Sequence, residues 1–313
     1  MKVKLKSLLK KKDVAEFKKI VSKSGFIILL LTIIQLAIAF IGSAFGLDEF
    51  KEFHGCVYLI YCAIAIGVIY KMDKHYVLDN DRQIHSMKPL SYFRCFTSML
   101  ALMLVFVTPT VILDVILNRF GYTILDIASA NTFSDTISEF IYISFLGPIC
   151  EEIIFRGMIQ KQLYKFTPFI AVFTSSVMFG IYHGNFGQIF QAIGVGIVLG
   201  YVAYRYSIKW SIALHITYNL GIGELFGLLS EFLDKGGEEY LLPIVNMTPF
   251  NFVVSLLAAI GFIFIFIQFF FKKNFLFKYN VKFSKFLIPF TSVGFIIFTI
   301  FNLITSVLLI VPA

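Results

Sequence analysis

The sequence predicts an all-α fold, a polytopic transmembrane helix bundle of about 8–9 spans. Hydrophobic residues make up 58% of the 313 residues and charged residues only 15%. The mean hydropathy is +0.84, far above that of a water-soluble domain. Apolar runs of about 20 residues, the length that crosses a bilayer as a helix, recur along the chain. We therefore expect the bilayer to surround most of the fold, and the composition gives no support for nucleic-acid binding.

The predicted spans follow one another with mostly short polar connections. The first follows a lysine-rich stretch that is too long for a typical signal-peptide n-region, so it is expected to be an uncleaved anchor. The second is short, and Pro289 can shorten or kink the last, which leaves eight and nine crossings open. The predicted spans are 26–46, 55–70, 95–117, 137–164, 168–184, 188–206, 210–230, 248–271 and 286–312.

The distribution of charge predicts how these spans are oriented. Lysine and arginine are concentrated in the N-terminal segment and in alternate connections, which are therefore expected to face the cytoplasm. This asymmetry also accounts for the net charge of +8. The sequence thus predicts a multi-pass protein of the cell membrane with a cytoplasmic N-terminus. The cytoplasmic set is 1–25, 71–94, 156–165, 205–209 and 272–285; the opposite set, poorer in positive charge, is 47–54, 118–136 and 230–240.

Ionisable residues inside apolar spans are informative, because each costs several kcal/mol unless it is paired or faces a wet cavity. In the segment 147–157, Glu151 and Glu152 are adjacent, and Arg156 lies one helical turn beyond Glu152. A Glu152–Arg156 ion pair is therefore available locally. Glu151 would then face another direction without a helical partner, as suits a general base. The alternative is a buried ion pair beside a neutral glutamic acid.

Two further polar clusters have helical spacing. Phe179 and His183 are four residues apart and share a helix face, so the ring can wall a pocket that the imidazole enters. His215 and Asn219 have the same spacing, and Asn219 can donate to a developing oxyanion. Considered separately, His183 is equally explained as an interfacial residue, and the His215–Asn219 pair as an interhelical hydrogen bond.

Together, the three clusters supply the carboxylate, imidazole and amide groups that activate a water and attack a carbonyl, with or without a metal. Glu151, His183 and His215 would also make a three-ligand Zn2+ site with an open position. However, the sequence has no HExxH motif and no helix with two histidines one turn apart. A zinc site and a metal-independent site therefore both stay open.

These residues resemble the motifs of the CPBP intramembrane proteases, which include the Rce1-type CAAX prenyl endopeptidases and bacterial Abi or bacteriocin-immunity proteins. The family's EExxxR, FxxxH and HxxxN motifs occur here in that order, over roughly residues 138–230. The helix with Gly196 and Gly200 also looks like the family pattern, and such a pair of small residues suits close helix packing. By this resemblance, Glu151 activates the water, Glu152 and Arg156 support it, His183 and His215 position water or substrate, Asn219 helps hold the oxyanion, and Phe179 is a supporting residue.

The resemblance implies a metallo- or glutamate-dependent intramembrane endopeptidase, a hydrolase that cleaves a membrane-embedded or lipidated peptide or protein. The roles that this resemblance implies are bacteriocin self-immunity and peptide processing. We expect four segments: 1–25, a basic cytoplasmic N-terminal segment; 26–137, flanking transmembrane helices; 138–230, the CPBP/CAAX-protease-like catalytic core; and 231–313, a C-terminal loop and transmembrane helices.

Two rival functions come from other classes. One is a catalytically silent immunity or scaffold protein that binds a membrane peptide. The other is a transporter or channel, since Asp114 and Glu224 also lie in apolar segments; we expect these two to lie near helix ends or to face partners. Helix length places Glu151 and His183 at similar depths, about 20–25 Å from the turn near residue 166, but His215 only about 10 Å from the turn near 208. A tilted helix, a re-entrant 184–188 segment or a deep 207–209 turn would reconcile these depths.

Overall fold

The computed structural model describes residues 11–78, 85–124, 134–225, 249–271 and 287–312. Its regular structure is helical apart from one antiparallel pair of two-residue strands, so the all-α prediction is confirmed. Four helical stretches are long and apolar enough to cross a membrane: Asp13–Ala44, Phe53–Lys71, Pro89–Asn118 and Phe186–Arg205. Three shorter apolar helices accompany them. The protein is therefore a membrane protein, while the total of eight or nine crossings, their orientation and the four-segment division stay predictions.

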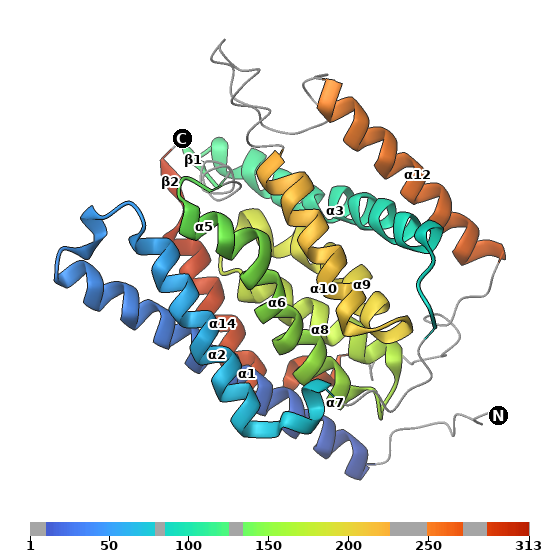
Figure 1. Cartoon of the computed structure of the whole chain (residues 1–313), viewed down its shortest axis with the longest axis horizontal. Helices are drawn as coiled ribbons and strands as arrows, with labels where there is room; N and C mark the ends of the chain where they lie inside the picture. Colours follow the sequence, from blue (N-terminus) through green and yellow to red (C-terminus); the bar gives the residue numbers. More distant parts are fainter. Residues whose placement is uncertain (1–10, 79–84, 125–133, 226–248, 272–286, 313) are drawn as a thin grey trace.

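The elements form a bundle in which α6, α8, α9 and α10 occupy the middle (Figure 1). In chain order they are α1 (Lys11–Ala44), η1 (Leu47–Glu49), α2 (Phe53–Leu78), α3 (Pro89–Asn118), β1 (Tyr122–Thr123), α5 (Ile137–Ile141), η2 (Tyr142–Leu146), α6 (Gly147–Glu152), η3 (Ile153–Gln160), α7 (Lys161–Leu163), α8 (Pro168–Tyr182), α9 (Phe186–Arg205), α10 (Ile208–Tyr218), η4 (Asn219–Glu224), α12 (Pro249–Phe271), η5 (Ile288–Thr291), α14 (Val293–Leu308) and β2 (Val311–Pro312).

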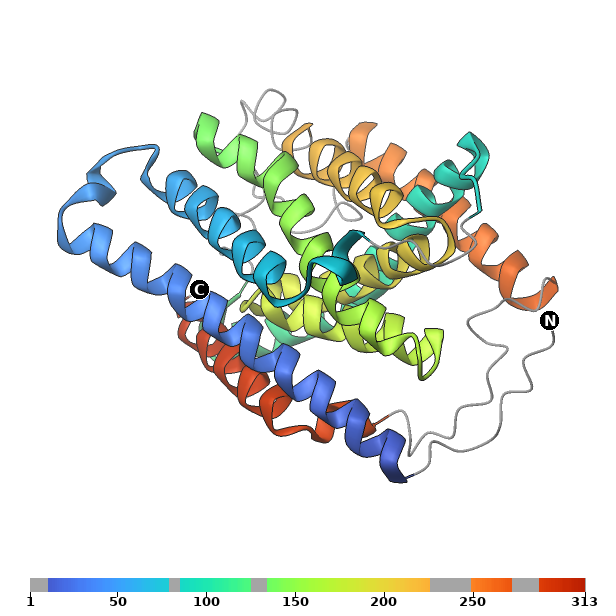
Figure 2. The ribbon, with the colours of Figure 1, turned by 60° about the horizontal axis from the view of Figure 1, so that its bottom comes forward.

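Helix α1 continues without a break from the basic stretch into the apolar run, and α14 packs along it (Figure 2). Glycines allow this close approach. A Cβ on Gly25 would lie 2.5 Å from the carbonyl oxygen of Gly294, and a Cβ on Gly294 would overlap the carbonyl oxygen of Ser22. The Gly294 N–H also donates to Ser22 Oγ at 2.9 Å. The backbones of α1 and α14 are therefore in direct contact at these glycines.

The predicted span 137–164 is one helical stretch of changing pitch. It passes from α5 through the π-helical segment η2 into α6, then through the longer π-helical segment η3 into α7. Pro148 lies inside this stretch and cannot donate the i→i−4 bond of a regular α-helix. π-Helical turns inside α-helices occur frequently at functional sites. This stretch carries Glu151, Glu152 and Arg156.

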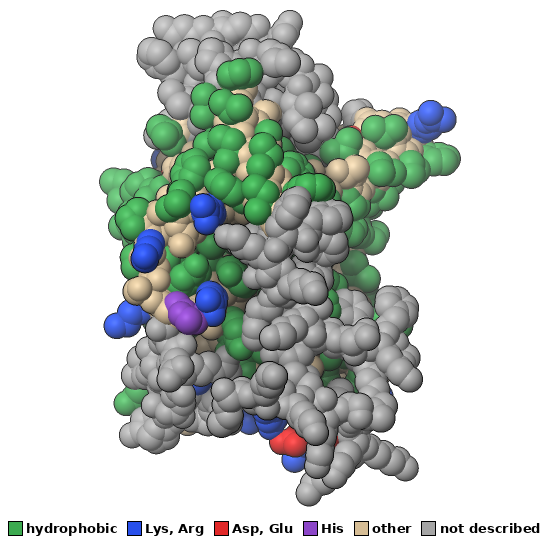
Figure 3. All heavy atoms as spheres, turned by 90° about the vertical axis from the view of Figure 1, so that its right-hand side faces the viewer, with side chains coloured by type: hydrophobic (Ala, Val, Ile, Leu, Met, Phe, Trp, Pro, Cys, Tyr) green, Lys and Arg blue, Asp and Glu red, His purple; other side chains and the backbone are tan. Residues whose placement is uncertain are grey.

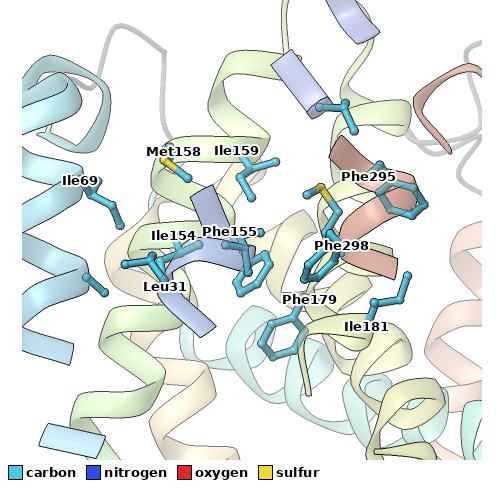
Figure 4. Packing of buried hydrophobic residues seen from close by; sticks show 14 of the residues in the cluster. Leu31, Ile69, Ile154, Phe155, Met158, Ile159, Phe179, Ile181, Phe295 and Phe298 are labelled. Carbon is cyan, nitrogen blue, oxygen red and sulfur yellow. The ribbon is translucent and has the colours of Figure 1, made fainter. Parts of the chain in front are cut away.

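Hydrophobic side chains fill two buried clusters and cover much of the described outer surface. Phe155 and Phe179 lie in the larger cluster, with side chains from α1, α2 and α14 around them (Figure 4). On the face shown in Figure 3, hydrophobic side chains are widely exposed. Large apolar side chains are also exposed on α1, where Phe40 is 77% exposed. Exposure of large apolar side chains on this scale fits contact with lipid.

At the end of the bundle opposite α7, a polar link joins α2 to α5. Ser138 donates its N–H to the carboxylate of Glu52 at 2.9 Å, and its hydroxyl to the Glu52 carbonyl at 3.2 Å. The side-chain and backbone hydrogen bonds with Ser138 hold the pKa of Glu52 below its ordinary value. Gly55 leaves the room for this contact, since a Cβ there would overlap Ser138.

We predict that Gly294→Ala lowers the free energy of unfolding by about 1–3 kcal/mol, because the added methyl meets backbone that cannot move aside. Gly67→Ala in α2 is the matched control, since a Cβ there meets nothing within 4 Å. That change is expected to leave stability within about 1 kcal/mol of the original protein. Thermal unfolding in detergent micelles measures both, and equal midpoints for the two variants would contradict the α1–α14 packing.

Candidate active site

Glu152 lies at the centre of a buried polar cluster. Its Oε1 is 3.1 Å from Nη1 of Arg156 and 3.2 Å from Nδ1 of His215. The side chains of Glu152 and Arg156 are both 0% exposed, and that of His215 is 4% exposed. The ion pair between residues 152 and 156 predicted from the i, i+4 spacing is therefore confirmed. A buried carboxylate needs such partners, because an uncompensated charge is costly in a low dielectric.

Helix α9 contributes a further partner to this ion pair. Arg156 Nη2 donates to the carbonyl of Gly196 at 3.1 Å, and one turn on, Gln160 Nε2 donates to the carbonyl of Gly200 at 2.8 Å. A Cβ on Gly196 would lie 3.3 Å from Arg156 Nη2, and one on Gly200 would lie 2.6 Å from Gln160 Oε1. The two glycines therefore let polar side chains reach the backbone of α9.

Glu151 faces the other nitrogen of the same imidazole. Its Oε2 lies 3.7 Å from Nε2 of His215, and its side chain is 15% exposed, unlike that of Glu152. Because the paired carboxylate of Glu152 accepts hydrogen bonds, Nδ1 of His215 carries the proton in the neutral imidazole. Nε2 then presents a lone pair toward Glu151. At a separation of 3.7 Å, one water that lies beside the two atoms can contact both.

His183 directly follows the last residue of α8, and its ring packs against Phe179. Its Nδ1 lies 2.9 Å from the Phe179 carbonyl, which can only accept, so its Nε2 is also a free acceptor when the ring is neutral. The Phe179 ring lies 4.9 Å from the His183 ring and 5.8 Å from the His215 ring, measured between centroids. The Arg156 guanidinium lies 4.6 Å from the same Phe179 ring. Phe179 is therefore a wall shared by both imidazoles and the arginine.

The chain turns sharply after His183. Gly184 has φ 63°, in the left-handed region that glycine adopts most easily. Its carbonyl accepts a hydrogen bond from Thr305 of α14 at 3.3 Å. Asn185 then caps α9, accepting from the Gln188 N–H at 2.9 Å. The left-handed Gly184 and the Asn185 cap thus turn the chain from α8 into α9.

Asn219 lies on the same helical stretch as His215 but has a different partner. Its Nδ2 donates to the carbonyl of Ile143 in η2 at 2.7 Å. Within the described part of the chain, its hydrogen bond thus goes to this carbonyl and not to the glutamates or histidines. An amide nitrogen carries two protons, so the second remains for another acceptor.

The two acidic residues that favoured a transporter have structural partners. Asp114, near the end of α3, accepts from Asn118 Nδ2 at 2.7 Å, from Thr123 Oγ1 at 2.8 Å and from the Ile124 N–H at 3.0 Å. Glu224, at the end of η4, accepts from Ser134 Oγ at 2.7 Å. Both residues thus have the partners expected for them, and Asp114 also lies near a helix end.

Ser211 is a site residue that the motif analysis missed. Its hydroxyl contacts Oε2 of Glu152 and lies 2.9 Å from the carbonyl of Leu199, and the residue is 0% exposed. Its position four residues before His215 was the available signal, because it extends the His215–Asn219 face by one turn. The imidazole of His215 lies against both glutamates, so the different helix lengths to the turns near 166 and 208 do not keep the clusters apart.

Comparison with known proteins identifies the segment that holds these residues. Residues 133–221 match the family model described as Type II CAAX prenyl endopeptidase Rce1-like. The match confirms the predicted resemblance to the Rce1-type family, and it spans less than a third of the chain, from just before α5 into η4. All seven site residues predicted from the sequence fall within it. No curated protein and no solved structure matches the chain.

We predict that Arg156→Met destabilises the protein by about 3–5 kcal/mol, because it leaves Glu152 charged and unpaired in the interior. Adding Glu152→Met to that variant is expected to restore most of the lost stability, since the buried charge is then removed as well. The control is Lys165→Met, which breaks a half-exposed ion pair with Glu16 and should cost about 1 kcal/mol or less. Denaturant unfolding in micelles measures all three, and no recovery in the double variant would contradict this account.

Proposed function

We propose that this protein is an intramembrane endopeptidase of the CAAX-protease type, which hydrolyses a peptide bond with a water activated by Glu151. The observation that carries the proposal is the contact between Glu151 and His215. One carboxylate oxygen lies 3.7 Å from an imidazole nitrogen whose opposite nitrogen is held by the buried Glu152–Arg156 pair. A base and a fixed acceptor thus face the same point, as general base catalysis requires.

The proposed reaction assigns a separate task to each group. Glu151 takes one proton from the water as its oxygen attacks the carbonyl carbon, and the other proton of that water is donated to the Nε2 lone pair of His215, while His183 positions the substrate. The free N–H of Asn219 donates to the oxyanion of the tetrahedral intermediate. The proton on Glu151 then passes to the leaving amine as the C–N bond breaks, which leaves a carboxylic acid and an amine. Glu152 and Arg156 hold His215 in place and take no part in bond changes.

The side chains as placed do not fit a metal site. Across residues 11–78, 85–124, 134–225, 249–271 and 287–312, no three His, Cys, Asp or Glu side chains gather in a group that could hold a metal ion. The proposed reaction therefore has no step through a metal. The zinc alternative from the sequence stays a prediction, and 1,10-phenanthroline treatment with metal analysis of the purified protein tests it. Cleavage that survives chelation supports the glutamate-activated water.

We propose a membrane-associated substrate, either a lipidated peptide or a membrane-embedded segment. Two observations support this class: the site lies among helices in a protein with four candidate spans, and the matching family model is described as a prenyl endopeptidase. Peptide processing and bacteriocin self-immunity are roles that such cleavage could serve. A fluorogenic farnesylated peptide in liposomes is a practical first probe.

We predict that Glu151→Gln lowers kcat by about 10²–10⁴-fold, because the amide fills the same space but cannot accept the water proton. Glu49→Gln, an exposed glutamate outside the site, is the matched control and should leave kcat unchanged. Comparative membrane proteomics of cells that carry each variant would reveal the substrate as a peptide that accumulates uncut with Glu151→Gln. Full cleavage by this variant would refute the role of Glu151.

A Glu151→Ala variant separates catalysis from silent binding. If the protein protects its host from a bacteriocin, protection should be lost with Glu151→Ala, since the proposed mechanism requires cleavage. Protection that survives Glu151→Ala at equal protein levels would instead favour an immunity or scaffold protein that only binds a membrane peptide.

A further inference from the structure

Ser211 makes a contact with the site that none of the three motifs includes. Its hydroxyl lies within hydrogen-bonding distance of Glu152 Oε2 and 2.9 Å from the carbonyl oxygen of Leu199. The residue is completely buried. A carbonyl can only accept, so the serine proton must serve either Leu199 or the carboxylate. The charged acceptor is the stronger of the two, and the hydroxyl is therefore expected to donate to Glu152.

The two oxygens of Glu152 have different surroundings. Oε1 is shared between Arg156 and His215, whereas Oε2 has Ser211 as its single hydrogen-bond donor in the part of the chain that the structure describes. The terminal torsion of a glutamate is broad and roughly two-fold, so contacts at both oxygens are needed to fix the plane of the carboxylate. Without Ser211, only the Oε1 side is held.

That plane determines where His215 points. His215 donates from Nδ1 to Oε1, and this bond sets both the tautomer and the orientation of the ring. The opposite nitrogen then faces Glu151 at 3.7 Å. The contacts therefore form a chain from Leu199 of α9 through Ser211, Glu152 and His215 to Glu151.

We propose that Ser211 is a positioning residue, which fixes the carboxylate plane of Glu152 and so holds the His215 imidazole in register with Glu151. The effect on catalysis rests on the proposed function, while the effect on His215 does not. Ser211, His215 and Asn219 are spaced four residues apart, so one face of the stretch from α10 into η4 presents all three groups.

The test compares Ser211→Ala with Ser306→Ala. Ser306 is also buried, at 1% exposure, and its hydroxyl donates to the carbonyl of Asn302 in its own helix α14, away from the glutamates. The control variant thus loses a buried hydroxyl and one hydrogen bond without touching the site. Ser211→Thr restores a hydroxyl at the site, and thermal unfolding in micelles shows that each variant is folded.

The first readout is the ¹⁵N spectrum of the histidine rings in the full-length protein in micelles. Ser211→Ala should change the ring signals of His215 toward a mixture of tautomers, and Ser211→Thr should restore them. The ring signals of His183 provide an internal reference, because its Nδ1 bonds to the Phe179 carbonyl and should not respond. Ser306→Ala should leave both rings unchanged. An unaltered His215 spectrum in Ser211→Ala would overturn the proposal.

The second readout is cleavage of the farnesylated peptide in liposomes. Ser211→Ala should lower kcat about tenfold, the usual scale for losing a hydrogen bond to a charged group, with KM within about twofold of its original value. An unchanged kcat, or a change in KM alone, would also overturn the proposal. If neither the original protein nor any variant cleaves any peptide, the proposed function fails, and the ¹⁵N readout by itself still decides whether Ser211 positions His215.

Discussion

The ion pair between Glu152 and Arg156 is the interaction on which the rest of the site depends. Two full charges removed from water are stable only if their mutual attraction and further hydrogen bonds offset the lost hydration. Here the further bonds come from three residues on two helices: His215 and Ser211 on α10, and Gly196, through its carbonyl, on α9. These bonds would break if α9 or α10 shifted along its axis. The ion pair therefore fixes the position of η3 relative to α9 and α10.

Small residues and irregular helix geometry make that arrangement possible. The side chains of Arg156 and Gln160 reach the backbone of α9 at Gly196 and Gly200, where a Cβ would crowd them. Three π-helical segments lie before, after and beside the key residues: η2 precedes Glu151, η3 follows Glu152, and η4 begins at Asn219. The i→i+5 hydrogen bonds of a π-helical turn leave some carbonyl groups without the partner that they have in an α-helix. In η2, the carbonyl of Ile143 accepts from Asn219.

The sequence predicted what depends on local spacing and missed what depends on packing between helices. The i, i+4 relation of Glu152 and Arg156 is local, so the ion pair could be predicted. The partners of His215 could not, because they depend on how α10 packs against α6 and η3. Ser211 was missed for a related reason: a lone serine in an apolar helix gains meaning only when its neighbour across the interface is known.

The geometry also explains why two adjacent glutamates can have different tasks. Glu152 has both oxygens occupied and no exposed surface, so it is suited to hold its neighbours and not to exchange a proton with a moving water. Glu151 is partly exposed, and its Oε2 lies near enough to Nε2 of His215 for one water beside the pair to contact both atoms. One residue step along the helix turns the two side chains about 100° apart. The same short sequence thus supplies a rigid support and a free base, and Arg156, which neutralises the first, leaves the charge of the second available for catalysis.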